Sequence, residues 1–442
     1  MKKLTVLFLI TAFCLIMTSP AFAADYSLED YLALVQQNNK DLLIAAANLK
    51  QATETEKLAR SQALPTIGLS ASLNKNFLEV EQATPVESKP GGGALIYKDV
   101  VVNTDYDFSF GLGLSQQLFN INVLNAIRAS KEYRNMSQSV YDAQNDAIIT
   151  AAKKVFFQCF LLEKFYDIKK QTEDRAYDHY MLMKKKYETG VVSKLAFLNS
   201  EVDWKMAVPE TTNARMNLEL CLINLKNLAG IAQEEEVNLT GDMSVFPDMP
   251  ENVELEQVME SRPDYLALMK EKSLRELNIK ANMANHFPTL SLDASYGYSA
   301  ADDKFSKTFN ENDKQVCKVG LTLSLPVYTG GALSAQDRTV KLDAETTELK
   351  IRKKREDIMS ELRKIYLSLQ REFENIALAE TTMTTAHQAY DIAETAFDNG
   401  VMTQLELKDV RVNLESAELQ QISSVYNYLC AYFDWQKATG NM

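Results

Sequence analysis

The chain has 442 residues, a formal net charge of −13 and 46% hydrophobic residues. The acidic balance argues against a nucleic-acid partner, because such a partner requires a basic surface. Four cysteines follow the N-terminal segment at positions whose spacing fits no metal-binding motif: Cys159, Cys221, Cys317 and Cys430. We expect buried free thiols, and a disulfide between Cys221 and Cys430 stays open as an alternative in an oxidising compartment. We expect no metal site and no cofactor.

Residues 1–23 have the pattern of a secretory signal peptide. Lys2 and Lys3 precede an apolar run, and the segment ends in Ala-Phe-Ala, which fits a cleavage site after Ala23. Cys14 follows the bulky Phe13, which argues against lipid attachment at that cysteine. No later run approaches the ~20 apolar residues of a membrane-spanning helix. We therefore expect an exported chain in which any membrane crossing uses β-strands.

Two short helices are expected next, over 27–38 with Ser27 as the N-cap, and over 39–62. The hydrophobic period then changes to two in four segments, at about 64–76, 105–119, 287–299 and 316–328. A soluble half-buried sheet gives this alternation, and so does an outer-membrane barrel. The strand length, the signal segment and the Tyr and Phe content favour the barrel. Four strands are too few to close a barrel, so several copies must share one.

Long helical patterns occupy most of the remaining chain, over 122–188, 191–230, 332–398 and 402–440. Each long helix of 67 residues would measure ~100 Å at ~1.5 Å per residue. The helix that follows each long helix is shorter, so we expect a second short helix to make up the difference. We therefore expect 191–230 to stack on 263–286 and 402–440 to stack on 39–62. The apolar spacing is typical of coiled coils, although a soluble bundle would share it. Pro209 should kink its helix.

The chain carries the same unit twice. Residues 187–200 and 397–410 each read aromatic, two polar residues, Gly, two apolar residues and a hydroxyl, and Gly190 and Gly400 lie 210 residues apart. Each Gly marks a reversal between two helices, because Gly readily adopts the left-handed conformation at a helix end. We expect a first repeat over 24–230, a belt segment over 231–262 beside the N-terminal helix and the C-terminus, and a second repeat over 263–442.

The two turns, the "LPT" and "FPT" strand starts, "SLPVYTGG" at 324–331 and "RPDY" at 262–265 together resemble the TolC family of outer-membrane efflux and secretion channels. The resemblance covers nearly the whole mature chain. It implies a mainly α fold with a membrane β-barrel portion: a homotrimer with a twelve-stranded barrel in outer-membrane lipid and a helical periplasmic tunnel. It also implies a passive exit duct in a tripartite efflux pump or type I secretion system. A periplasmic adaptor and an inner-membrane RND, ABC or MFS transporter would deliver small molecules or proteins to it.

The resemblance also implies two kinds of site. The adaptor would dock on the tips, formed by Gly190, Val191, Ser193, Gly400, Val401 and Thr403. Glu406 and Asp409, three residues apart on one helix face, would ring the entrance in three copies and favour cations. The alternative is an ordinary solvated helix face. Glu406 stands where the family's best-known member has Asp, and Met402 stands where that member has an Arg of the closed gate.

Two other functions are compatible with an exported helical chain, a periplasmic enzyme and a secreted helical scaffold with a small soluble sheet. The three histidines, His179, His286 and His387, form no catalytic motif, and no G-x-S-x-G, H-E-x-x-H or phosphate-binding loop occurs. We interpret His179 and His387 as helix-surface residues. An enzyme is therefore not expected, and the sequence does not specify the cargo.

Overall fold

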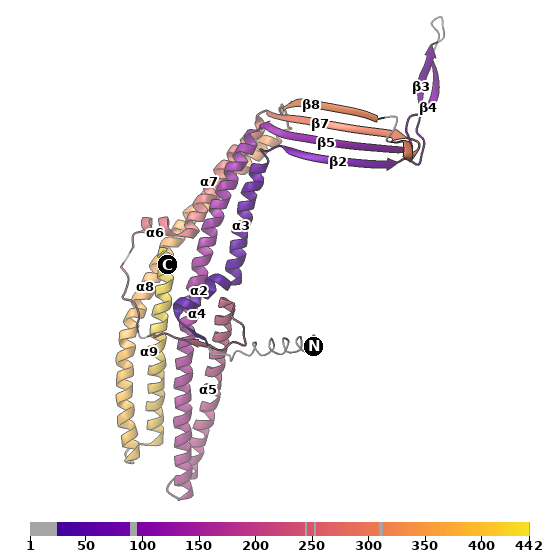
Figure 1. Cartoon of the computed structure of the whole chain (residues 1–442). Coiled ribbons are helices and arrows are strands. Elements are labelled where there is room, and N and C mark those ends of the chain that lie inside the picture. Colours follow the sequence, from indigo (N-terminus) through magenta and orange to yellow (C-terminus); the bar gives the residue numbers. More distant parts are fainter. Residues whose placement is uncertain (1–23, 89–94, 244, 252, 309–312, 442) are drawn as a thin grey trace, which may run out of the picture. The chain divides into compact units, whose positions relative to one another are not determined.

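The computed structural model describes residues 24–88, 95–243, 245–251, 253–308 and 313–441. The predicted signal peptide lies outside the described residues. The chain forms two compact units, shown together in Figure 1. Among the described residues, the hairpin unit contains 24–49, 137–267 and 351–441, and the sheet unit contains 50–136 and 268–350. Each unit therefore takes segments from both predicted repeats.

The sheet unit is built on one antiparallel four-stranded sheet in the order β2-β5-β7-β8. The strands are β2 (Thr66–Lys75), β5 (Tyr106–Phe119), β7 (Thr289–Asp302) and β8 (Asp313–Ser324). The register aligns Leu69, Leu112 and Tyr296 across three strands, so the alternating apolar positions share one face. The four strands expected from the period of two are present, and the fold class is confirmed.

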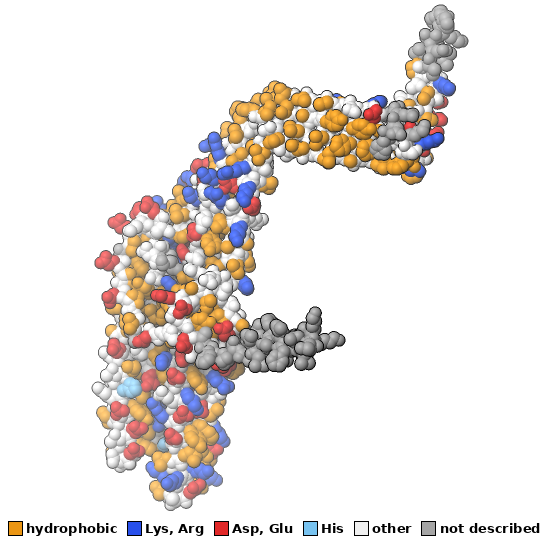
Figure 2. All heavy atoms as spheres, viewed as in Figure 1, with side chains coloured by type: hydrophobic (Ala, Val, Ile, Leu, Met, Phe, Trp, Pro, Cys, Tyr) orange, Lys and Arg blue, Asp and Glu red, His pale blue; other side chains and the backbone are white. Residues whose placement is uncertain are grey.

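The apolar face of this sheet is exposed to a degree that a buried core would not allow. Ile67 is 69% exposed, Val319 is 72% and Leu323 is 70%. Hydrophobic side chains gather over the sheet in Figure 2. Within the described residues no further strand pairs with the outer edges of β2 and β8. The sheet thus presents an apolar surface and two open edges.

A second hairpin, β3 (Glu81–Ser88) with β4 (Leu95–Val101), forms between β2 and β5, where no strand was expected. Pro85 lies within β3, and the register shifts between Pro85 and Glu87. A proline has no amide N–H to donate to a neighbouring strand, so its presence argues against predicting a strand in that segment. The pairing survives because the irregularity sits at the proline.

The hairpin unit is helical. Its elements, some of which continue into the sheet unit, are α2 (Leu28–Asn38), α3 (Lys40–Ser61), α4 (Ile121–Glu188), α5 (Lys194–Ala229), α6 (Leu255–Ser261), α7 (Pro263–Met283), α8 (Ala332–Asp398) and α9 (Gln404–Thr439). Ser27 caps α2 as predicted, because its side chain accepts from the Asp30 amide at 3.2 Å. Pro209 lies inside α5 without ending it.

Two buried clusters hold the helices of this unit together. One packs Tyr31 of α2 against Phe156 and Leu225 of the α4–α5 pair. The other packs Leu369 of α8 against Tyr428 of α9. All five side chains are at most 1% exposed. Burial of this kind contributes roughly 1.5–3 kcal/mol per large side chain, so each hairpin has its own apolar core.

The predicted stacking of the shorter helices is wrong. The end of α5 meets the start of α3: Asn39 Nδ2 donates to the Leu228 carbonyl at 2.9 Å, and a Cβ at Gly230 would lie 2.9 Å from Asn38 Cβ. The end of α9 meets the start of α7, where Ser261 Oγ donates to the Thr439 carbonyl at 2.8 Å. Each repeat therefore stacks its own two helices. Helix length alone could not identify the stacking partners, because 39–62 and 263–286 are equally long.

The described residues of the segment 231–262 lie beside the N-terminal helix and the C-terminal helix. In this belt segment β6 (Val237–Leu239) pairs in parallel with β1 (Ala24–Tyr26), and Tyr26 Oη donates to Glu235 Oε1 at 2.9 Å. Tyr428 Oη of α9 donates to the Pro247 carbonyl at 2.9 Å. The remaining short elements are the 3-10 helices Ala284–His286 and Phe305–Lys307.

None of the helices in the described part of the chain combines the length and the apolarity that a membrane crossing requires.

Candidate entrance site at the helical tips

The two tips are built by the same backbone device. After α4, the Gly190 amide donates to the Tyr187 carbonyl at 2.9 Å, and the Val191 amide donates to the Lys186 carbonyl at 2.8 Å. This is the Schellman arrangement of a helix end. Gly190 has φ +74°, and a Cβ added there would meet nothing within 4 Å. The backbone conformation, rather than lack of space, therefore requires the glycine.

The second tip repeats the first in geometry. The Gly400 amide donates to the Phe397 carbonyl and the Val401 amide to the Ala396 carbonyl, both at 2.9 Å, and Gly400 also has φ +74°. The next residues are exposed apolar side chains, with Val191 70% and Val401 83% exposed. The structure thus places the two predicted glycines and the two valines at solvent-exposed reversals.

Hydroxyl residues start the returning helices. Ser193 Oγ accepts from the Ala196 amide at 3.2 Å and caps α5. Thr403 caps α9 in a full capping box, because Glu406 Oε2 accepts from the Thr403 amide at 2.8 Å and from Thr403 Oγ1 at 2.7 Å. Satisfying these otherwise free amides stabilises each helix start.

The acidic pair lies on the exposed first turns of α9. The two Thr403 hydrogen bonds lower the pKa of Glu406, the backbone one most, so this carboxyl is ionised at neutral pH. Asp409 is exposed, and among the described residues no hydrogen bond or ion pair holds it. Sequence reasoning missed the capping role of Glu406, although Thr-x-x-Glu at 403–406 is the signature of a capping box.

Met402, the residue that departs from the family's gate, is partly buried. It packs against the small cluster of Tyr390, Ala393, Leu407 and Leu414 between α8 and α9. An apolar side chain here adds to the core of the second hairpin. Met402 therefore supplies packing where a polar gate contact was in question.

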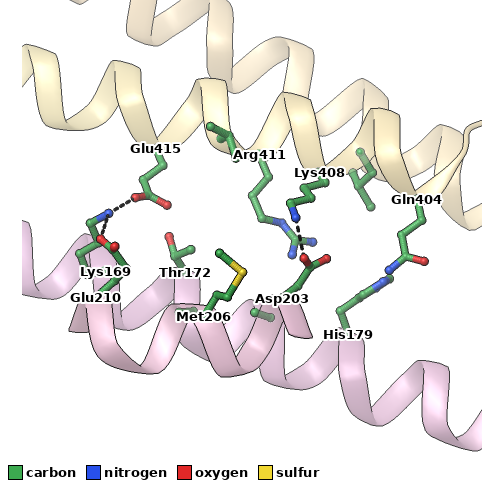
Figure 3. Close-up of a pocket in the computed structure, with 14 residues that line it drawn as sticks. Lys169, Thr172, His179, Asp203, Met206, Glu210, Gln404, Lys408, Arg411 and Glu415 are labelled. Atoms are coloured by element: carbon green, nitrogen blue, oxygen red, sulfur yellow. Dashed lines mark hydrogen bonds and ion pairs between the residues drawn. The ribbon is translucent and has the colours of Figure 1, made fainter. Parts of the chain in front are cut away.

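Polar contacts between α9 and the α4–α5 pair were not predicted. Lys169 Nζ lies 2.6 Å from Glu415 Oε1 and 3.1 Å from Glu210 Oε2. Lys408 Nζ lies 2.5 Å from Asp203 Oδ1. Figure 3 shows these side chains lining one cavity. We call Lys169–Glu415 and Lys408–Asp203 the inter-hairpin ion pairs, and Glu210 of α5 supports Lys169 from within the first hairpin.

The charge on Lys169 is favoured in this setting. Burial alone would lower its pKa, but the hydrogen bonds to Glu415 and Glu210 raise it above the ordinary value. Ion pairs that are partly desolvated are screened less by salt than exposed ones. The contacts join residues far apart in sequence, so pattern reasoning along the chain could not find them.

The surface interpretation of histidines holds for His387, whose side chain is 48% exposed beside Glu418, and is wrong for His179. His179 lies in the same cavity, and its Nε2 is buried without a hydrogen-bond partner among the described residues. Burial and the neighbouring Arg411 guanidinium lower the pKa of His179. The imidazole is therefore neutral at pH 7.

The chain is similar to known proteins over almost its whole length. The family described as outer membrane efflux protein matches residues 32–231 and 255–441. Outer membrane protein TolC of Escherichia coli is 20% identical, covering 94% of this chain and 83% of its own. Alkaline protease secretion protein AprF of Pseudomonas aeruginosa is 21% identical, covering 95% and 85%.

The fold has the same relatives. The crystal structure of the Campylobacter jejuni CmeC outer membrane channel superposes with a TM-score of 0.77 at 20% identity, covering 94% of this chain and 85% of that one. Probable efflux pump outer membrane protein TtgC of Pseudomonas putida is 21% identical, covering 95% and 84%. These relatives are named as outer-membrane channel, efflux and secretion proteins, and the chain belongs to the outer membrane efflux protein family.

Proposed function

We propose that three copies of this chain form one passive exit duct through the outer membrane. The observation that carries this proposal is the four-stranded sheet with an exposed apolar face and two open edges. Lipid tolerates no unpaired strand edge, and closed barrels need about eight or more strands. Pairing β2 of one copy with β8 of the next closes the edges without any other protein.

The two faces of the sheet suit this arrangement. The apolar face would contact lipid, and the opposite face, with Gly68, Gly113, Ser295 and Lys318, would line a water-filled passage. The relatives named as efflux and secretion proteins place the family at the outer membrane. The signal segment 1–23, cleaved after Ala23, would take the chain there.

The tips would be the periplasmic end of the duct. Two exposed valines on rigid Schellman turns offer a small apolar contact surface of fixed shape, suited to a periplasmic adaptor protein. The docking residues are Gly190, Val191, Ser193, Gly400, Val401 and Thr403. The adaptor would in turn connect the duct to an inner-membrane transporter of the RND, ABC or MFS class, and the transporter would select the cargo.

The acidic pair would form the entrance. Three copies of Glu406 and Asp409 around one axis would give a carboxylate ring that attracts cations. The inter-hairpin ion pairs would hold the resting tip, because opening it by moving α9 away from α4 and α5 breaks Lys169–Glu415 and Lys408–Asp203.

Cross-linking at the sheet edges tests the shared barrel. In a Cys317→Ser background, one cysteine replaces Ser70 on β2 and one replaces Thr322 on β8, and oxidation should join chains into covalent dimers and trimers in outer-membrane fractions. The matched control places a cysteine at Ser109 on the inner strand β5 together with the one at Thr322, which should leave the chains unlinked. Recovery of uncross-linked chains from several registers of the edge pair would argue against the proposal.

A further inference from the structure

Two cysteines from different helices meet inside the first hairpin. Cys159 of α4 and Cys221 of α5 lie with their sulfur atoms 2.6 Å apart, and both are free thiols in the structure. They are 1% and 5% exposed and belong to the cluster with Tyr31 and Phe156. The sequence left a Cys221–Cys430 disulfide open only as an alternative to free thiols, and in the structure Cys221 Sγ lies against Cys159 Sγ instead.

The surroundings restrict what this thiol pair can do. No group of three or more His, Cys, Asp or Glu side chains that could hold a metal occurs among the described residues. Besides its contact with Cys159, the Cys221 thiol makes one hydrogen bond within the described residues, donating to the Val155 carbonyl at 3.8 Å. The pair is therefore a closed, apolar two-thiol site between two helices.

The compartment favours oxidation of such a pair. Outer-membrane proteins cross the bacterial periplasm, where disulfides form and persist. A disulfide requires sulfur atoms that reach about 2.05 Å with Cβ atoms a few ångströms apart, which cysteines already in contact can satisfy. We propose that Cys159 and Cys221 form a disulfide that covalently joins α4 to α5. The proposal rests on the proposed outer-membrane location.

The chemistry balances as a thiol–disulfide exchange with a periplasmic oxidoreductase disulfide. The Cys221 thiolate attacks one sulfur of that disulfide, and the released oxidoreductase thiolate takes up a proton. The Cys159 thiolate then attacks Cys221 Sγ and expels the second oxidoreductase thiolate. Two protons and two electrons thus pass from the chain to the oxidant.

Burial sets the time at which this step occurs. Both thiols are covered once Tyr31 of α2 packs on the hairpin, so an oxidoreductase reaches them only during folding. The finished bond would then be shielded from reductants. Because the two cysteines are 62 residues apart, the closed loop contains the whole first tip with Gly190.

The second hairpin has no such link. The positions 210 residues later are Leu369 and Ala431, both buried in the core of α8 and α9. Cys430 lies next to that position but is only partly buried, and Cys317 is exposed on β8. The link would therefore fix the first hairpin covalently and leave the helices of the second joined by non-covalent contacts.

Counting thiols in the full chain tests the proposal. Outer membranes prepared without reductant are dissolved in denaturant with an alkylating reagent, and the chain is weighed and digested with trypsin. We expect two alkyl groups on the mature chain, on Cys317 and Cys430, and a joined peptide of residues 155–164 and 216–226. Prior reduction should give four alkyl groups and separate peptides.

Two variants act as matched controls. Cys430→Ser should keep the joined peptide and reduce the free thiols from two to one, and Cys159→Ser should raise them to three. Four alkyl groups on outer-membrane chains without reduction, or a peptide joining Cys221 to Cys430, would overturn the disulfide and leave the proposed duct untouched. A joined peptide in a chain recovered only from soluble fractions would support the disulfide and contradict the duct.

Discussion

The two hairpins share one backbone plan and differ in the side chains that secure it. Both end in a Schellman turn with a glycine at φ +74°, and both returning helices start at a hydroxyl cap. The first hairpin stacks on α3 through the neutral amide of Asn39, whereas the second stacks on α7 through a charged network. Duplication therefore preserved the backbone geometry, while the interactions that stabilise it diverged.

The charged network centres on Arg262, which is 4% exposed. Its guanidinium lies 2.8 Å from Asp264 Oδ2 and 2.7 Å from Glu361 Oε2, and it donates to the Ala438 carbonyl at 3.3 Å. Burial alone would raise the pKa of Asp264, but hydrogen bonds from Arg262 and Lys354 lower it. The second junction thus depends on ionisation and the first does not.

The largest expected effect comes from breaking both tips at their glycines. Gly190→Val and Gly400→Val each force a β-branched residue into a left-handed conformation, at roughly 1–2 kcal/mol or more. We expect export to fall at least ~10-fold by loss of the tip shape, with trimers still formed. Gly68→Ala, at a sheet position where a Cβ meets nothing within 4 Å, is the control. Normal export by both tip variants would contradict the docking assignment.

The next effect separates the two junctions. Arg262→Ala leaves Asp264 without its main partner and should cost about 3 kcal/mol, at the low end for a buried pair because Asp264 is partly exposed. Asn39 also caps the start of α3, because its Oδ1 accepts from the Asp41 and Leu42 amides at 3.0 and 3.1 Å. Asn39→Ala removes this cap and one interhelical hydrogen bond and should cost about 1–2 kcal/mol. Hydrogen exchange at each junction measures both. Equal losses of local stability in the two variants would contradict the distinction between a charged and a neutral junction.

Acid should weaken the contact between the hairpins. Burial lowers the pKa of His179. The imidazole therefore binds a proton more tightly when α9 has moved away from α4 and α5 than when these helices are in contact. The contact is therefore fully favoured above the ordinary pKa of about 6.5 and weakens as pH falls below it. We expect channel conductance to rise between pH 7.5 and 5.5, and His179→Gln to abolish this rise. His387→Gln, on the exposed side chain, should behave as wild type; loss of the rise there too would contradict the assignment.

The smallest expected effect concerns the entrance charge. Glu406→Gln with Asp409→Asn removes both carboxylates while keeping the capping box, since Gln can replace Glu there. Cation preference in planar bilayers should fall several-fold without loss of trimer. Glu356→Gln, at an exposed position on α8, is the control. Unchanged ion selectivity in the double variant would reduce the pair to a solvated helix face.

Much of the fold followed from local patterns. The period of two marks the four strands of the sheet, and Gly with its flanking residues marks each tip, because these signals lie within a few residues of one another. The stacking partners did not follow, since 39–62 and 263–286 have equal lengths and contact residues far away in sequence. The hairpin of β3 and β4 was not predicted, because Pro85 argues against a strand in that segment.

The candidate site shows the same division between local and distant signals. The glycines, valines and hydroxyls of the tips are local features and were named from the sequence. The ion pair of Lys408 with Asp203 and the meeting of Cys159 with Cys221 depend on how helices pack, which spacing along the chain does not encode. The Glu406 cap was readable from Thr403 but was assigned only to the entrance.

The account depends above all on sharing of the sheet among copies. The most direct measurement is the native mass of the full chain extracted from outer membranes in mild detergent, before and after heating. We expect a mass of three chains that falls to one on heating, as the edges of β2 and β8 separate. A native mass of one chain that stays in aqueous solution without detergent would contradict the account.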